Sequence, residues 1–205
     1  MAGDEVLGVW TSPVEDSDVG LRACTAALGM LEAIDDYNRD HAQLPILTRF
    51  GLDAGWIEQG NFGAGADYSF NVIGDAVNTA KRIEGLNKTL GTGILASAKA
   101  ASRIDTLMFR SVGRFLLKGK SHPIEVKELV GRTGSLSDST VERCRLFEQA
   151  LEAIHHGNIQ LAFTVLNSIR RENADDGPTS FYLGLIESAS HDRRIRSDGV
   201  VVLDE

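Results

Sequence analysis

Apolar residues recur at helical spacing along five stretches of the chain. They line one face of a predicted helix over Val19–Tyr37 and of a second over Asp75–Leu86. Three further helices are predicted near the end of the chain, at Val141–His155, Ile159–Arg171 and Thr179–Ala189. The first two helices are separated by strand-like segments, whereas the last three follow one another directly.

Short apolar runs predict strands in the first two thirds of the chain. The runs are Val6–Trp10, Ile46–Ala54, Phe70–Ile73, Ile94–Ala96, Phe109–Val112, Arg114–Leu117 and Ile124–Leu129. Repeated glycines between Gly55 and Gly65 predict a hairpin with a flexible loop. Ser97 is predicted to cap a short helix that ends near Ile104. This alternation predicts an α+β sandwich with helices on one face of a mostly antiparallel sheet.

A change in composition divides the chain. Residues 131–139 are rich in glycine and serine and indicate a linker. We therefore predict one domain over residues 1–131, a linker over 132–140, a helical tail over 141–190 and a final segment, 191–205, to which the pattern assigns no structure. The tail resembles one tetratricopeptide-type helical hairpin with an extra helix, which is too short to form a stable solenoid alone. We expect it to pack on the main domain or on a protein partner.

Composition and charge narrow the class of protein. The chain has 205 residues, a net charge of −8 and a pI of about 5.1, so it lacks the basic surface of a nucleic-acid-binding protein. Local cations can still hold a nucleotide substrate. No apolar run approaches the roughly 20 residues of a membrane helix, and the first residues lack the basic start of a signal peptide. We expect a cytoplasmic protein with its two cysteines, Cys24 and Cys144, reduced.

Asn78 and Arg82 are the first candidates for chemistry. They are four residues apart, so both project from one face of the predicted helix. An amide beside a guanidinium can bind an oxyanion such as a phosphate. On spacing alone, however, two solvated side chains on a surface helix are the favoured interpretation.

A longer match around these residues reverses that preference. Residues 60–63 are Gly-Asn-Phe-Gly, and residues 72–82 are Val-Ile-Gly-Asp-Ala-Val-Asn-Thr-Ala-Lys-Arg. This pair of motifs resembles the signature of the class III nucleotide cyclases, of the bacterial adenylyl cyclase type. The stretch Leu117-Lys118-Gly119-Lys120, followed by Pro-Ile-Glu-Val, resembles the last hairpin of that family. The resemblance covers roughly residues 3–130. It implies a ferredoxin-like cyclase sandwich, incomplete at its N-terminus, followed by the small helical region.

The resemblance also implies a reaction and residue roles. The ribose 3′-hydroxyl of ATP attacks the α-phosphate, and 3′,5′-cyclic AMP and pyrophosphate are formed. The resemblance implies that this product acts in intracellular signalling. Asn78 would orient the ribose, and Arg82 would stabilise charge on the α-phosphate. Lys118 would hold the terminal phosphates, with Lys120 as the second choice and a solvated hairpin tip as the alternative. Asn71 would contact the base, at a position where adenylyl cyclases usually carry Asp or Thr.

The family uses two divalent cations, Mg²⁺ or Mn²⁺, held by two aspartates. Asp4 resembles the second of these, although an isolated N-terminal carboxylate on the surface would look the same. The first aspartate lies upstream of this motif in the family, and no corresponding segment is present in the sequence. Metal binding by one aspartate alone is expected to be much weaker.

Three hypotheses follow from the missing segment. The chain could be a truncated form of an active cyclase, which would work as a homodimer or as a heterodimer with another cyclase chain. It could instead be an incomplete module that pairs with or regulates a complete cyclase and supplies Asn78 and Arg82 to the metal site of its partner. The third hypothesis is a structural scaffold with a protein-binding helical tail. The longer relatives of such a chain could be anchored in a membrane.

Overall fold

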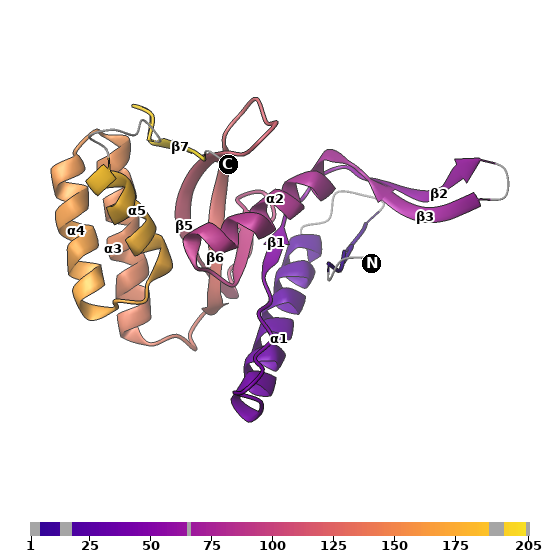
Figure 1. The fold of residues 1–205 in the computed structure, drawn as a ribbon, viewed down its shortest axis with the longest axis horizontal. Helices are drawn as coiled ribbons and strands as arrows, with labels where there is room; N and C mark the ends of the chain where they lie inside the picture. The colour runs from indigo at the N-terminus through magenta and orange to yellow at the C-terminus, as the bar shows by residue number, and fades with distance from the viewer. Residues whose placement is uncertain (1–4, 13–17, 65–66, 189–194, 204–205) are drawn as a thin grey trace.

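The computed structural model describes residues 5–12, 18–64, 67–188 and 195–203. The predicted metal ligand Asp4 lies outside these ranges. Within them the main sheet has five strands in the order β1-β4-β6-β5-β7 (Figure 1). The members are β1 (Phe50–Leu52), β4 (Ile94–Ser97), β5 (Leu107–Leu116), β6 (Ile124–Arg132) and β7 (Val200–Val202). The two outer pairs are parallel and the two inner pairs antiparallel, so the sheet is mixed rather than mostly antiparallel.

Helices cover both faces of this sheet, which corrects the one-sided arrangement predicted above. Helix α1 (Asp18–Asp40) buries Cys24, Ala27 and Leu28 against Ile94, Leu107 and Leu129. On the other face, Leu95 and Phe115 belong to a larger core formed with α2 (Asp75–Leu90) and the C-terminal helices. Successive residues of β4 therefore serve opposite cores, as the two-residue period of a strand requires.

The helical tail shares the core of the sheet. It comprises α3 (Asp138–His155), α4 (Ile159–Glu172) and α5 (Gly177–Ser188), which lie together beside β5 (Figure 1). Phe147, Leu166 and Tyr182 are buried in one cluster with Ile83 of α2. The final segment, for which the sequence predicted no structure, supplies β7, which pairs in parallel with the end of β5. The tail thus covers one face of the sheet and one edge.

Several predicted elements need correction. Val6–Trp10 form no strand: the Val6 side chain is 94% exposed, and Glu5 instead pairs with Lys81 of α2. Only three residues of the predicted strand Ile46–Ala54 pair, as β1 with β4. The strands predicted on either side of Gly113 form one strand, β5, because the irregular register between Ser111 and Gly113 lets the chain continue without a turn.

The helix predicted after Ser97 is a series of turns over residues 98–103. The Ser97 hydroxyl does accept a hydrogen bond from the Ala100 N–H, at 3.2 Å, as a helix cap would. The chain leaves the helical conformation at Arg103, whose φ is 59°. A left-handed residue at this point ends the turns before a helix can form.

The predicted glycine-rich hairpin is present and longer than expected. Its strands are β2 (Glu58–Ala64) and β3 (Asp67–Ile73), which pair with each other and form a separate two-stranded sheet. The hairpin extends away from the rest of the molecule as an arm (Figure 1). Its return strand leads through Gly74 directly into α2.

Candidate functional site

Helix α2 carries the central part of the candidate site. It buries Ala76, Thr79, Ile83, Leu86 and Leu90, while Asp75 and Asn78 are exposed and Arg82 is half-buried. These last three residues are separated by three and four positions, so they lie along one face of the helix. The helix ends at Gly91, whose left-handed backbone (φ 66°, ψ 33°) donates its N–H to the Asn87 carbonyl.

Contacts between α2 and β1 set the distance of the helix from this strand. A Cβ atom on Gly51 would lie 2.2 Å from both the Ala80 carbonyl oxygen and the Glu84 nitrogen, so only glycine allows this approach. The buried Asn87 amide donates to the Phe50 carbonyl oxygen at 2.9 Å and accepts from the Thr92 hydroxyl at 2.8 Å. Because these contacts are buried and satisfied, they hold the exposed face of α2 in one position relative to the sheet.

The connection between β5 and β6 brings two lysines to the same region. Gly119 in this connection has a φ of 66°, and a Cβ atom there would lie 3.2 Å from a terminal nitrogen of Arg82. The guanidinium of Arg82 therefore lies against the turn of residues 117–120, called the lysine turn below. The turn also borders a hollow of about 360 Å³, lined by residues 116–120 with Val202 and Leu203.

The two lysines of the lysine turn differ in environment. Lys118 is exposed. The Lys120 side chain is only 13% exposed, and its Nζ lies 2.5 Å from each carboxylate oxygen of Asp75. Lys120, the second choice of the sequence analysis, is thus in direct contact with α2. The role of Lys118 in holding the terminal phosphates stays a prediction.

Asp53 adds a carboxyl group that the sequence analysis did not select. It follows β1, and burial raises its pKa. A hydrogen bond from the Ser97 side chain, the backbone N–H of Ala54 and the charges of Lys120 and Lys99 partly offset this rise in pKa. The signal in the sequence was an acidic residue directly after an apolar run, which is a weak one because strands often end at an exposed aspartate.

The remaining predicted site residue, Asn71, lies on β3 at the base of the arm. It is exposed, it is paired in register with Gly60, and its side-chain oxygen accepts a hydrogen bond from the Val72 N–H at 2.9 Å. The structure therefore brings Lys120 into contact with Asp75, and Arg82 against Gly119 of the same turn. Asn78 joins them through its place on the exposed face of α2, and Asn71 lies four residues before that helix.

The described residues do not form the expected metal site. Among them, no three His, Cys, Asp or Glu side chains are grouped closely enough to hold a metal ion. Asp75 is engaged by Lys120, and Asp53 accepts from Ser97. This donor set therefore does not fit a pair of divalent cations.

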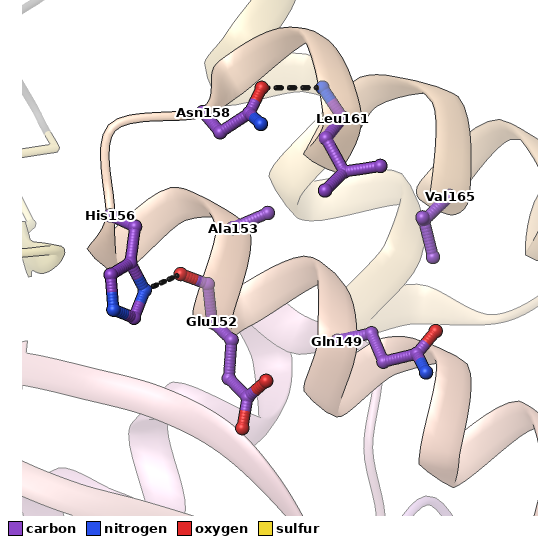
Figure 2. Close-up of a pocket in the computed structure, with 7 residues that line it drawn as sticks. All are labelled: Gln149, Glu152, Ala153, His156, Asn158, Leu161 and Val165. Carbon is purple, nitrogen blue, oxygen red and sulfur yellow. Dashed lines mark hydrogen bonds between the residues drawn. The ribbon is translucent and has the colours of Figure 1, made fainter.

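A second hollow lies between α3 and α4, within the helical tail (Figure 2). Its volume is about 330 Å³, and its lining residues are Gln149, Glu152, Ala153, His156, Asn158, Leu161 and Val165. Asn158 caps α4 through the Leu161 N–H, and the His156 ring contacts the Glu152 carbonyl oxygen at 2.8 Å. The lining has neither lysine nor arginine, so it lacks the cations that mark the site on α2. No helix in the described ranges has the length and apolarity needed to span a bilayer.

Comparison with known families finds one family model that matches the first part of the chain. The model of the adenylate and guanylate cyclase catalytic domain matches residues 2–129. Adenylate cyclase 1 of Rhizobium meliloti (strain 1021) is 36% identical over 133 residues, which are 63% of this chain and 20% of that protein. The adenylate cyclase of Anabaena cylindrica is 31% identical over 138 residues, which are 62% of this chain and 26% of that protein. The chain thus spans about a fifth to a quarter of the length of these relatives.

Comparison with solved structures supports the same fold. The crystal structure of the guanylyl cyclase Cya2 aligns with a TM-score of 0.50 and 23% sequence identity, over 62% of this chain and 66% of that one. The shared fold is α+β, with a mixed sheet and helices that follow it here. At this level of identity the match concerns the fold and not the substrate.

Proposed function

The chain belongs to the family of adenylate and guanylate cyclase catalytic domains, and we propose that it takes part in converting ATP to 3′,5′-cyclic AMP and pyrophosphate. The observation that supports this proposal is the meeting of α2 and the lysine turn. Arg82 lies against Gly119, Asn78 shares the exposed face of α2, and Lys120 contacts Asp75. Cations from two separate elements therefore surround one region, which suits a triphosphate.

In the proposed reaction the ribose 3′-oxygen forms a bond to the α-phosphorus as the bond to pyrophosphate breaks. The hydroxyl proton leaves to solvent or to a base, and the electron pair of the broken bond goes to pyrophosphate. Arg82 would stabilise the charge that develops on the α-phosphate, because its planar fork can donate to two oxygens at once. Asn78 would orient the ribose through its amide, and Lys118 or Lys120 would bind the terminal phosphates.

Adenine would contact Asn71 at the base of the arm. Its amide can both donate and accept, so the preference for ATP over GTP rests on the adenylate cyclase relatives rather than on this residue. Asp4 would be a ligand of Mg²⁺ or Mn²⁺, whose chemistry in this family is activation of the 3′-hydroxyl. The described residues would supply binding, orientation and charge stabilisation.

A second function is favoured because the described residues contain Asn78 and Arg82 without a cluster of metal ligands. In the described residues Arg82 is half-buried beside the exposed Asn78, and no three His, Cys, Asp or Glu side chains are grouped to hold a metal ion. A chain of this kind could pair with a complete cyclase domain and donate Asn78 and Arg82 to a metal site held by its partner. In a homodimer, each chain would instead supply Asn78 and Arg82 to a metal site that includes Asp4 of the other chain.

The test is formation of cyclic nucleotide by the 205-residue chain with excess Mn²⁺, using ATP and then GTP. Arg82→Ala is the matched variant, and its activity should fall on the order of 100-fold or more. A chain that is inactive alone should be mixed with a cyclase domain that lacks its own Asn and Arg. Activity that appears only in the mixture would support the donor role, and no product in either experiment would contradict both functions.

A further inference from the structure

The ion pair between Lys120 and Asp75 joins two elements that are 45 residues apart in sequence. The two partners are unequally exposed: the Lys120 side chain is 13% exposed, whereas that of Asp75 is 85% exposed. The lysine stem is therefore covered, and its ammonium emerges at the carboxylate on the first turn of α2. A lysine side chain has four rotatable carbon–carbon bonds, so a partner that pairs with its ammonium restricts where the charge lies.

A second carboxyl group, that of Asp53, is influenced by the charge of Lys120. Asp53 follows β1 and accepts a hydrogen bond from Ser97 on the adjacent strand β4. Lys120 exerts an attractive charge effect on Asp53, as does Lys99. The ammonium of Lys120 is therefore paired with the carboxylate of Asp75 on α2 and also attracts the carboxyl of Asp53 beside the sheet. The turn that carries Lys120 meets Arg82 at Gly119.

We propose that Asp75 is a positioning residue, which holds the ammonium of Lys120 on the α2 side of the lysine turn so that Lys120 and Arg82 bind the same polyphosphate. The inference rests on the proposed function, since it concerns how this site holds its substrate. An ammonium has three donors, and the carboxylate of Asp75 accepts two of them. A terminal phosphate oxygen can be added without displacing the carboxylate. Asp75 acts only through Lys120 and is not itself a ligand of the substrate.

The first test needs no nucleotide and no catalysis. The full chain is treated with a limiting amount of an amine-acylating reagent, and modification of Lys118 and Lys120 is measured by fragmentation mass spectrometry. In the unchanged protein Lys120 should react slowly, because its side chain is 13% exposed and its ammonium is paired with Asp75. In Asp75→Asn, Lys120 should react about 3- to 10-fold faster, Lys118 should be unaffected, and Asp75→Glu should restore the slow rate. An equal Lys120 rate in the Asn variant and the unchanged protein would overturn the inference.

The same acylation experiment, repeated with inorganic tripolyphosphate, tests whether Lys120 binds a polyphosphate. Tripolyphosphate should protect Lys120 from acylation in the unchanged protein and in Asp75→Glu. Protection should require a several-fold higher concentration in Asp75→Asn, because the ammonium is no longer held in place. Equal protection of Asp75→Asn and the unchanged protein would contradict the positioning role, even if the carboxylate does slow acylation.

Kinetics then separate positioning from a purely structural effect. Asp75→Asn should raise KM for ATP about 3- to 10-fold with kcat within twofold, and Asp75→Glu should recover most of the loss. In a Lys120→Gln background, Asp75→Asn should have no further effect, since its role passes through Lys120. A lower KM in Asp75→Asn would mean that the carboxylate competes with phosphate, which overturns the inference. A lack of cyclic nucleotide both from the chain alone and from the mixture with a partner cyclase domain would defeat the proposed function, while the acylation experiment would still decide whether Asp75 holds Lys120.

Discussion

The hydroxyl of Tyr182 in α5 donates a hydrogen bond to the main-chain carbonyl of Val112 in β5, with 2.9 Å between the oxygens. Both residues are buried, and burial raises the pKa of the Tyr182 phenol well above its usual value. The bond lies beside the bulge of β5, where Gly113 has a φ of 117° and a Cβ atom would approach the Tyr182 oxygen to 2.1 Å. Helix α5 of the tail therefore packs closely on β5, the strand that leads to the lysine turn.

Replacing Tyr182 by phenylalanine is the first test of this contact. It leaves the Val112 carbonyl buried without its partner while the ring packing is kept. We expect the free energy of unfolding to fall by about 1–2 kcal/mol. Urea denaturation measures the change. Tyr37→Phe is the matched control, because Tyr37 is 43% exposed and should lose almost nothing. Equal stability of Tyr182→Phe and the unchanged protein would show that water satisfies the carbonyl.

A buried ion cluster provides a second connection between tail and sheet. Arg110 of β5 donates to Asp176 at 2.8 Å and to Glu128 of β6 at 2.8 Å, and its guanidinium lies over the Phe147 ring, 5.0 Å from the centroid. Asp176 also accepts from the Thr179 N–H and so caps α5. Burial acts to raise the pKa of Asp176, but the charge of Arg110 and the hydrogen bonds from Thr179 and Arg110 outweigh it and lower that pKa.

Asp176→Asn should destabilise the fold by about 3 kcal/mol at neutral pH, since it removes one partner of a buried ion pair. A carboxyl whose pKa is lowered by folding stabilises the protein above its unfolded pKa of about 4, and that contribution is lost as the pH falls through the lower folded value. The stability advantage of the unchanged protein over the variant should therefore be full at pH 7 and shrink below about pH 4. Unfolding in urea across pH 3–7 measures it, with the exposed Asp175→Asn as control. A difference that does not vary with pH would contradict the ionised pair.

The sequence predicted α2 well because its signals are local. Apolar spacing, Gly74 before the helix and the family motif together placed Asn78 and Arg82 on one helix, and the structure has α2 over Asp75–Leu90. The motif also drew attention to the lysine turn. These features depend on residues that are close in sequence, so the pattern could reveal them.

Other features depend on distant residues. The continuity of β5 through Gly113 depends on a bulge beside Tyr182, almost 70 residues further along the chain. The contact of Lys120 with α2 depends on Asp75, 45 residues earlier. Similarly, β7 becomes a strand only because the edge of β5 is available to it. A pattern of neighbouring residues contains none of this information.

Gly51 on β1, beneath α2, and Gly85 on the exposed face of α2 offer a matched comparison of glycine-to-alanine substitutions. Gly51→Ala would place a Cβ atom 2.2 Å from the backbone of α2, so the helix must move or the strand must shift. We expect a loss of about 3 kcal/mol in the free energy of unfolding. Gly85→Ala meets no atom within 4 Å on the exposed face of the same helix and should gain about 0.5–1 kcal/mol. Thermal unfolding compares them. A neutral Gly51→Ala would mean that α2 is not held tightly on β1.

Asn71 provides a prediction about the base that the site accepts. Its side-chain oxygen accepts from the Val72 N–H, which leaves the amide N–H groups of this exposed side chain to face a ligand. A donor suits the guanine O6 as well as the adenine N1. An aspartate at this position accepts only, so it should bind the amino group of adenine and repel the O6 of guanine.

In Asn71→Asp, the ratio of kcat/KM for ATP to kcat/KM for GTP should therefore rise, by about 10-fold if one hydrogen bond to the base is exchanged for a repulsion. Initial rates of cyclic AMP and cyclic GMP formation, measured with both nucleotides present, give the ratio directly. Asn61→Asp is a suitable control, because Asn61 is also exposed on the arm but precedes the turn of the hairpin. If both variants change the ratio equally, the effect comes from charge on the arm. If only Asn71→Asp changes it, the base lies against Asn71, and the short path from β3 through Gly74 into α2 would explain how one segment recognises the base and the α-phosphate together.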